Sequence, residues 1–278
     1  MLRTRIITAL VLLAILLLIL YLDSYPVFAL ALAAFFAAAA WEGLRLFGVK
    51  TPIPGAALWT AAFLFLAFRG DPSHLAAQFI VLIGLSAVFW LVRLAPSLMI
   101  GLPALDAIGN RLLNGMYGVS ILACFMAMLV LFQHSTLYLF SVLAIVWIAD
   151  IGAYFSGKAF GKRKLAPSIS PGKSWEGAIG GWIAVLVLAG ISTRIPQLQD
   201  TFAAKLLTAW GWLGFVPTMT VIVMASVVGD LFESQLKRRI AMKDSSNLLP
   251  GHGGVLDRID ALIPVLPLAV LFEYWIVA

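Results

Sequence analysis

Two pairs of acidic residues are the first feature of the sequence whose types and spacing could do chemistry. Asp230 and Glu233 lie three residues apart near the end of one apolar segment, and Asp257 and Asp260 repeat that spacing at the start of the next. On a helix this spacing puts both side chains of a pair on one face. Carboxylates in an apolar helix are costly, so they usually face a cavity or a partner.

These acids have two alternative explanations. Like charges this close would repel each other unless a cation intervened, and Mg²⁺ typically takes one or two carboxylates together with substrate phosphates. The alternative is that Lys237, Arg238 or Arg258 neutralises them in plain salt bridges. Two pairs beside a basic, glycine-rich loop favour the metal over the salt bridges.

That loop lies between the two acid pairs. Its PGHGG segment, residues 250–254, supplies backbone N–H groups that could point at phosphate oxygens just before a helix. Lys237, Arg238 and Lys243 add positive charge, and His252 could act as an acid, a base or a phosphate donor. The alternative is a turn with basic residues at a membrane surface, and we favour that reading for Arg239.

A second basic loop follows Asp150. Residues 152–159 resemble a phosphate-binding P-loop, but Ala159 replaces the Ser or Thr that would hold Mg²⁺, and an apolar helix precedes the segment. A P-loop is therefore excluded. A polyanion-binding loop is still predicted from Lys158, Lys162, Lys164 and Lys173 together with Ser168 and Ser170. The alternative is that these lysines are a topology signal that marks the cytoplasmic side. Gly177, Gly180 and Gly181 after the loop indicate close helix packing.

Composition identifies the kind of element that must position these residues. Of the 278 residues 62% are hydrophobic and only 12% are charged, far from the usual globular composition, so this is a membrane protein. The net charge of +6 reflects basic loops, and we infer no nucleic-acid partner. Cys124, the single cysteine, excludes a disulfide framework and a multi-cysteine metal site.

A bilayer-spanning helix needs roughly 20 apolar residues. By that criterion we predict nine transmembrane helices, with eight as the alternative because the third is short. The N-terminal apolar run is longer than a signal peptide requires and is interpreted as a retained first helix. The predicted spans are about 4–22, 26–42, 55–68, 75–94, 112–132, 136–156, 175–193, 212–236 and 255–277.

The distribution of Lys and Arg tests this topology, because short cytoplasmic loops collect positive charge. With the N-terminus in the cytoplasm, only Arg69, Arg194 and Lys205 of the 19 basic residues fall on the far side. Both charge-rich loops, 156–174 and 237–254, then face the cytoplasm. We predict a single all-α polytopic membrane domain over 1–278, with scaffold helices mainly in 1–140 and catalytic helices and loops in 141–278, around a polar cavity open to the cytoplasm.

At these two loops the sequence resembles the phosphatidate cytidylyltransferase family. The segment SQLKRRIAMKDSSNLLPGHGGVLDRID, residues 234–260, meets every fixed position of that family's spaced signature. The upstream segment DIGAYFSGKAFGKRKLAPSISPGKSWEG, residues 150–177, looks like its other characteristic segment. Together they cover about a fifth of the chain, and the earlier helices fit only in number and hydrophobicity.

The resemblance implies transfer of CMP from CTP to phosphatidate, giving CDP-diacylglycerol and pyrophosphate. By motif position it makes Asp230 and Asp257 metal ligands, with Asp260, Glu233 and Asp150 as further candidates. The implied catalytic residues are Asp230, Asp257, Lys237, Arg238 and His252. The implied substrate-binding residues are Lys173, Ser170, Lys243, Asp244, Gly253, Gly254, Arg258 and Lys158.

The same resemblance implies Mg²⁺, with a monovalent cation such as K⁺ as an option, and a homodimer in a bacterial-type inner (plasma) membrane. Two rival functions remain. A CTP-using lipid kinase, or a transferase acting on another lipid phosphate, would share the acids and basic loops. A transporter for an anionic solute would also place charges in helices, but here the acids lie at one membrane edge instead of the midplane.

Overall fold

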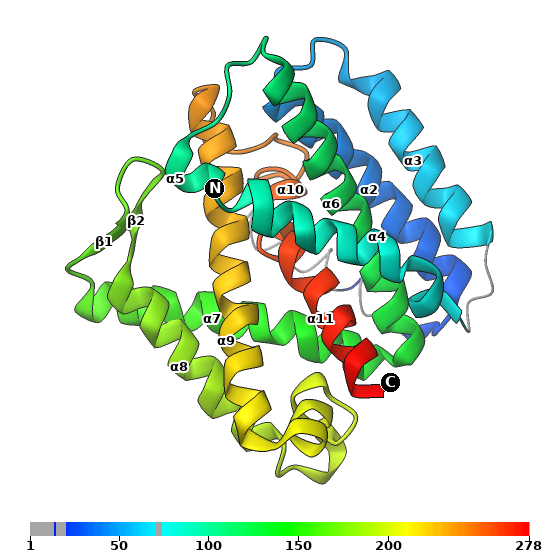
Figure 1. The fold of residues 1–278 in the computed structure, drawn as a ribbon, viewed down its shortest axis with the longest axis vertical. Coiled ribbons are helices and arrows are strands. Elements are labelled where there is room, and N and C mark those ends of the chain that lie inside the picture. The colour runs from blue at the N-terminus through cyan, green and yellow to red at the C-terminus, as the bar shows by residue number, and fades with distance from the viewer. Residues whose placement is uncertain (1–13, 15–20, 70–73, 278) are drawn as a thin grey trace.

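The protein is a bundle of long helices, seen in a computed structural model that describes residues 14, 21–69 and 74–277 (Figure 1). Within those residues eight helical segments are long and apolar enough to cross a membrane. The elements are α2 (Tyr25–Leu46), α3 (Pro52–Arg69), α4 (Leu75–Phe89), the π-helical turn η2 (Trp90–Leu94), α5 (Ser97–Ile100), α6 (Ile108–His134), α7 (Thr136–Phe160), β1 (Lys164–Ala166), β2 (Ser170–Ser174), α8 (Trp175–Ser192), η3 (Pro196–Leu198), α9 (Phe202–Arg239), α10 (Leu256–Ile259) and α11 (Leu262–Val277).

Each of the eight predicted spans from 26–42 onward coincides with one of these helical segments. The first predicted span, about 4–22, lies outside the described residues apart from positions 14, 21 and 22. The largest difference is at α9, which begins at Phe202 and not near 212. Gly211 interrupts that helix with φ 58° and ψ −168°, so the predicted start marks a kink inside a longer helical segment.

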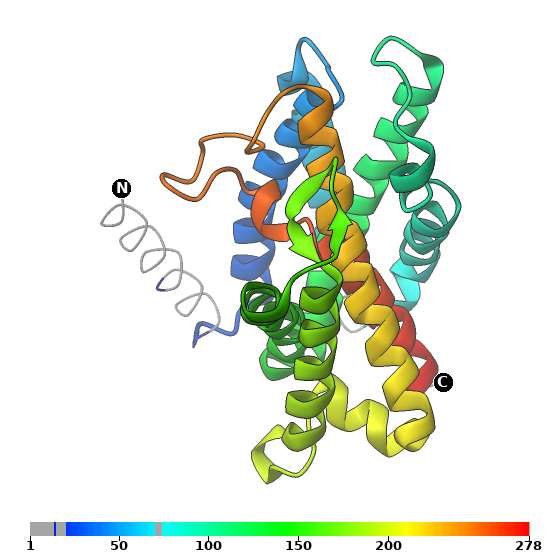
Figure 2. The ribbon, with the colours of Figure 1, turned by 90° about the vertical axis from the view of Figure 1, so that its left-hand side faces the viewer.

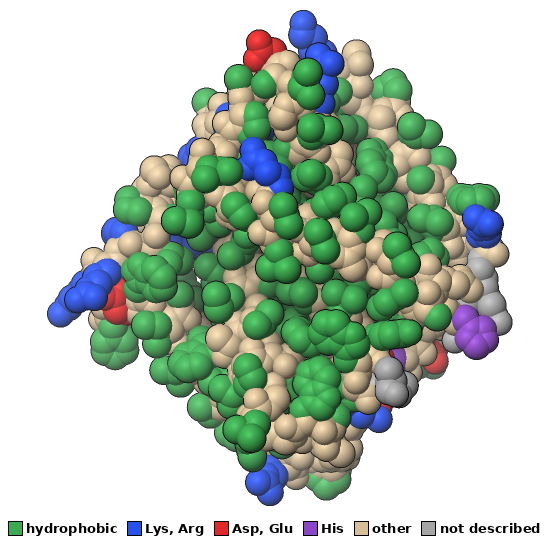
Figure 3. All heavy atoms as spheres, in the orientation of Figure 1, with side chains coloured by type: hydrophobic (Ala, Val, Ile, Leu, Met, Phe, Trp, Pro, Cys, Tyr) green, Lys and Arg blue, Asp and Glu red, His purple; other side chains and the backbone are tan. Residues whose placement is uncertain are grey.

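The core of the bundle is built around α6. Its second half, from Ser120 to Phe132, is buried at every position. Phe36 of α2 and Phe63 of α3 stack at 5.1 Å between ring centroids, and Phe125 of α6 meets both rings edge-on. The outer face is different: Figure 3 shows hydrophobic side chains spread over the bundle, with most Lys and Arg near its edges. This pattern suits helices surrounded by lipid.

Helices α7 and α8 approach each other closely because small residues line their contact. A Cβ atom on Gly152 would lie 2.9 Å from the Ala184 side chain, and one on Gly177 would lie 2.9 Å from the Ala153 carbonyl oxygen. A Cβ on Gly180 or Gly181 would overlap the opposite helix outright. The predicted packing role of Gly177, Gly180 and Gly181 is therefore confirmed.

Gly181→Ala is expected to destabilise the protein by about 1–3 kcal/mol, the usual cost of overpacking. The new methyl group would meet the Ala149 carbonyl, which belongs to the backbone of α7 and cannot rotate away. Thermal unfolding in detergent measures the effect. Gly84→Ala on α4 is the matched control, because a Cβ there meets nothing within 4 Å. Equal unfolding midpoints for the two variants would contradict the prediction.

The described residues are helical as predicted, and a short β-hairpin interrupts them between α7 and α8. Strands β1 and β2 pair antiparallel, with Lys164 opposite Ser174 and Ala166 opposite Ser170. At the end of the hairpin the Ser174 hydroxyl accepts the Gly177 N–H at 3.1 Å and so caps α8. The Glu176 carboxylate accepts the N–H groups of Lys162 and Arg163. The basic residues of this loop are thus carried on an ordered hairpin.

The chain connections alternate between two ends of the bundle. In Figure 1 the segments after α2, α5, α7 and α9 lie toward the upper and left-hand edges, whereas the starts of α2, α4 and α9 and the end of α11 lie toward the lower and right-hand edges. Figure 2 shows the hairpin and the segment 240–255 both in the upper half of the molecule. The Arg238 guanidinium joins them by donating to the Ile169 carbonyl at 3.3 Å. The two charge-rich loops therefore share one end, as predicted.

Candidate active site

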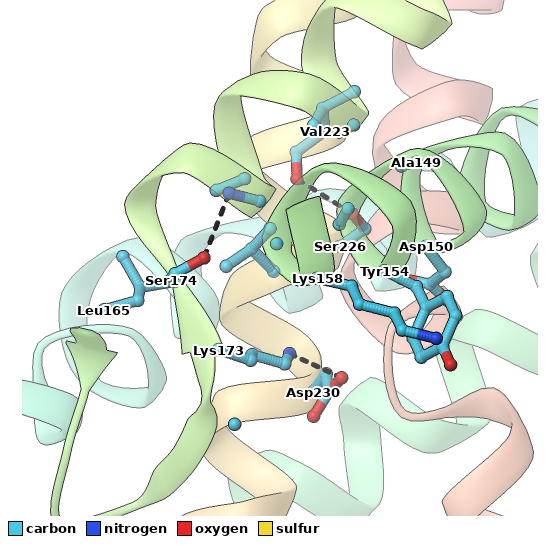
Figure 4. Close-up of a pocket in the computed structure, with 17 residues that line it drawn as sticks. Ala149, Asp150, Tyr154, Lys158, Leu165, Lys173, Ser174, Val223, Ser226 and Asp230 are labelled. Carbon is cyan, nitrogen blue, oxygen red and sulfur yellow. Dashed lines mark hydrogen bonds and ion pairs between the residues drawn. The ribbon is translucent and has the colours of Figure 1, made fainter. Parts of the chain in front are cut away.

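A cavity of about 530 Å³ opens between α7, α8, α9 and the hairpin. Figure 4 shows Lys173 reaching from β2 to Asp230 on α9, where the ammonium and a carboxylate oxygen are 2.5 Å apart. Asp150, Tyr154 and Lys158 line the cavity from α7, because their spacing of four residues puts them on one helix face. Small and aliphatic side chains, such as Ala149, Ala153 and Val223, complete its wall. The cavity therefore combines charged groups with an apolar lining.

The Lys237 ammonium joins the two acid pairs. It donates to Glu233 Oε2 at 3.0 Å and to Asp257 Oδ1 at 2.6 Å. All three side chains are largely withdrawn from solvent: 11% of Lys237, 5% of Asp257 and none of Glu233 is exposed. Of the salt bridges that we gave as the alternative to a metal ion, those of Lys237 are therefore present. Arg238 and Arg258, the other proposed counterions, are exposed.

The second oxygen of Asp257 is held by the loop that precedes it. Asp257 Oδ2 accepts the Ser245 N–H at 2.8 Å, the Ser245 hydroxyl at 2.9 Å and the Gly254 N–H at 2.8 Å. A Cβ on Gly253, whose φ is +85°, would lie 2.7 Å from the same oxygen. We predicted that the N–H groups of residues 250–254 could point at phosphate. The N–H of Gly254 instead donates to Asp257. The glycines allow the backbone to wrap closely around this carboxylate.

The remaining predicted residues surround this centre. Asp260 interacts electrostatically with Asp230 and Glu233, and Asp150 does so with Asp230 and Lys173. The Asp244 side chain lies beside Gly253. Four other predicted binding residues form no hydrogen bond or ion pair with Lys237, Glu233 or Asp257 in the described part of the chain: Ser170 on β2, Lys158 on α7, Lys243 in the loop after α9 and Arg258 on α10.

Two polar atoms at the site are buried and lack a hydrogen-bond partner among the described residues, Glu233 Oε1 and His252 Nδ1, although the Glu233 carboxyl also lies close enough to the Asp260 carboxyl to interact with it. Buried polar atoms usually have a partner, so each of these is a candidate to meet a bound group.

The donor set fits a hard cation in its chemistry. Asp230, Glu233, Asp257 and Asp260 supply carboxylate oxygens, which Mg²⁺ prefers, and Glu233 Oε1 is unpartnered among the described residues. In the arrangement seen here the ammonium groups of Lys173 and Lys237 lie against these acids. No group of three or more His, Cys, Asp or Glu residues within the described part of the chain is arranged to hold a metal by itself. Substrate phosphates would supply the missing oxygens.

Sequence reasoning missed Glu42. This residue lies on α2, in the part of the chain interpreted mainly as scaffold, yet its fully buried carboxylate contacts the loop before Asp257. The available signal was the charge itself, because a carboxylate within an apolar helix usually has a specific partner. Arg239, which we interpreted as a basic residue at a membrane surface, is instead half-buried at the end of α9 and donates to the carbonyls of Leu46 and Pro103 and to Asn110.

The fold and the site together define a multi-pass membrane protein with paired carboxylates and cations at one end of its helix bundle. A family model described as the cytidylyltransferase family matches residues 3–275. The chain belongs to this family.

Curated relatives narrow the comparison further. A phosphatidate cytidylyltransferase of Haemophilus influenzae is 39% identical over 99% of this chain and 100% of its own length. One from Pseudomonas aeruginosa is 42% identical over 96% of this chain and 95% of its own length. One from Bacillus subtilis is 43% identical over 52% of this chain and 49% of its own length. The predicted family is confirmed.

Proposed function

We propose that the protein transfers CMP from CTP to phosphatidate, forming CDP-diacylglycerol and pyrophosphate. The observation that carries the proposal is the network Lys173–Asp230 and Glu233–Lys237–Asp257. Lys173, Lys237 and Asp257 lie within the two segments that match the family signature, and Asp230 and Glu233 come just before the second of them. Full-length relatives named phosphatidate cytidylyltransferase support it. The cavity beside the network has both the charge for phosphates and the apolar wall for a lipid.

The reaction forms one bond and breaks one. A phosphate oxygen of phosphatidate attacks the α-phosphorus of CTP, and the bond from that phosphorus to the bridging oxygen breaks, so that pyrophosphate leaves with the electron pair. Because a phosphate monoester has lost most of its second proton near neutral pH, no strong base is needed. Catalysis of this kind rests on positioning and on neutralising charge.

The residues divide into two groups. We assign Asp230 and Asp257 as ligands of Mg²⁺, with Glu233, Asp260 and Asp150 nearby; when bound, the ion would neutralise charge on the phosphates. Lys237, Arg238, Lys243, His252 and Arg258 would orient phosphate groups from the loop side. Lys173, Ser170 and Lys158 would do so from the hairpin and α7.

The topology of substrate delivery is part of the proposal. We place the end of the bundle that carries both basic loops in the cytoplasm, with the N-terminus on the same side, because most Lys and Arg residues gather there. CTP would arrive from that side, and the acyl chains would enter sideways between helices. A homodimer, a K⁺ ion and an inner-membrane location remain predictions of the family resemblance. Nine transmembrane helices remain a prediction from the lengths of the apolar runs.

Radioactive CTP tests this function directly. With purified protein and phosphatidate in detergent micelles, label from α-³²P-CTP is expected to reach the lipid, whereas label from γ-³²P-CTP is not. A chelator should abolish the transfer, and a reaction without phosphatidate is the control. Label from the γ position would indicate a lipid kinase. Absence of any transfer by folded protein would refute the proposal and favour another lipid phosphate or transport.

A further inference from the structure

Glu42 connects the N-terminal helices to the loop that carries the second acid pair. Its side chain is fully buried and accepts four hydrogen bonds. Oε1 accepts from the Ser246 hydroxyl at 2.5 Å and from the Val255 N–H at 3.1 Å. Oε2 accepts from the Ser245 hydroxyl at 3.2 Å and from the Leu256 N–H at 2.6 Å. A single carboxylate thus holds both ends of the segment from 245 to 256.

Ser245 links Glu42 to Asp257. Its hydroxyl lies 3.2 Å from Glu42 Oε2 and 2.9 Å from Asp257 Oδ2, while its N–H also contacts Asp257. The Ser245 hydroxyl has one proton, which the two carboxylates share as acceptors. Both acids together therefore set the position of Ser245. Ser246 differs because its side chain contacts Glu42 and accepts the Leu248 N–H, and it forms no hydrogen bond with Asp257 in the described part of the chain.

The packing leaves little freedom for this arrangement. A Cβ atom on Gly254 would overlap the Ser245 hydroxyl and the Glu42 carboxylate. The N–H of the same glycine donates to Asp257 Oδ2. The segment therefore has close contacts with Glu42 on one side and Asp257 on the other, and α10, which begins with Leu256, packs against α2. A displacement of the Glu42 carboxylate would be transmitted to Asp257.

We infer that Glu42 is a positioning residue of the transfer reaction: through Ser245, Val255 and Leu256 it holds Asp257 against Lys237. This inference rests on the proposed function. Helix α2 then contributes to the reaction through Glu42, although Glu42 itself does not touch Lys237. The same geometry predicts that the hydrogen bonds, and not merely the presence of a polar group, are required.

Glu42→Gln is the sharpest variant because it conserves size. Each carboxylate oxygen accepts one backbone N–H, so either orientation of the glutamine amide places its NH₂ group against a backbone donor. The turnover number is expected to fall about 10–100-fold, the usual effect of removing a group that orients a functional ligand. The KM for phosphatidate should stay within about threefold, because the cavity wall is untouched.

Two serine variants form the matched comparison. Ser245→Ala removes the hydroxyl that joins Glu42 to Asp257, while its N–H to Asp257 is kept, and should lower turnover by about tenfold. Ser246→Ala removes the contacts to Glu42 and to the Leu248 N–H but none to Asp257, and should change turnover less than about twofold. The double variant Glu42→Gln/Ser245→Ala should be little slower than Glu42→Gln, because both changes act on one path. Thermal unfolding and elution of each protein in detergent would establish the folded fraction for these comparisons.

Hydrogen exchange supplies a readout that does not depend on turnover. In Glu42→Gln the amides of residues 254–257 should exchange faster than in the wild type, while those of β2 and α9 should not change. Unchanged exchange, equal effects of the two serine variants, or a loss of activity no greater than the loss of folded protein would overturn the inference. A wild type that transfers no label would refute the proposed function, and the exchange experiment would still decide whether Glu42 holds this segment.

Discussion

Asp257→Asn is expected to lower the rate of CMP transfer by about 10²–10³-fold, the range found when one preorganised electrostatic group is removed from a reacting centre. Asp257 Oδ1 accepts the Lys237 ammonium, and Oδ2 accepts the N–H groups of Ser245 and Gly254. An asparagine amide has only one acceptor oxygen, so its NH₂ group would face a donor in either orientation. The substitution removes the negative charge and disturbs the loop that surrounds it.

Initial rates with α-³²P-CTP in phosphatidate micelles measure this effect. Asp106→Asn is the matched control, because Asp106 is an exposed carboxylate in the connection before α6. Its rate should equal that of the wild type. A folded Asp257→Asn protein that retains more than about a third of the wild-type rate would show that this carboxylate is not part of the reacting centre.

Lys237→Met is expected to impair both stability and activity. The change leaves Glu233 and Asp257 without their common cation, and breaking a buried ion pair by removing one partner costs about 3–5 kcal/mol. Methionine is apolar and fills much of the space of the lysine stem, so the loss is mainly electrostatic. Transfer should fall below detection if the ammonium also contacts substrate phosphate.

The double variant Glu233→Gln/Lys237→Met separates the two roles. It removes the buried carboxylate that would otherwise lack a partner, and part of the lost stability should return in thermal unfolding. Transfer should stay absent, because no cation remains between the acid pairs. Recovery of activity together with stability would mean that Lys237 serves only as a counterion for Glu233.

The elements were predictable because hydrophobic periodicity and length are local properties. The runs that became α6, α7 and α8 needed no tertiary information to be recognised as spans. The hairpin was not predicted, since its strands of three and five residues carry no alternating apolar pattern. The start of α9 was misplaced because a kink at Gly211 divides a helix whose first part contains the polar residues Lys205 and Thr208.

The site was predictable in its composition and only partly in its pairing. The spacing of Asp230, Glu233, Asp257 and Asp260 indicated two acidic faces. In the structure Lys237 pairs with Glu233 and Asp257, Lys173 pairs with Asp230, and Asp260 interacts electrostatically with Asp230 and Glu233. That Lys173 pairs with Asp230 could not be deduced from spacing, because β2 and α9 are distant in sequence. Glu42 was missed for the same reason: its partners lie in the loop before α10.

The sequence by itself therefore determined the class of protein, the described membrane spans, the common end of the two basic loops and, through the signature in residues 150–177 and 234–260, the family. The tertiary structure decided which cation meets which acid, the direction of the Gly254 N–H and the part that α2 plays at the site. The physical reason is that spans and loop charges follow from local composition. Side-chain pairing depends on how each helix is rotated and shifted against the others, and the packing of the whole bundle sets that arrangement.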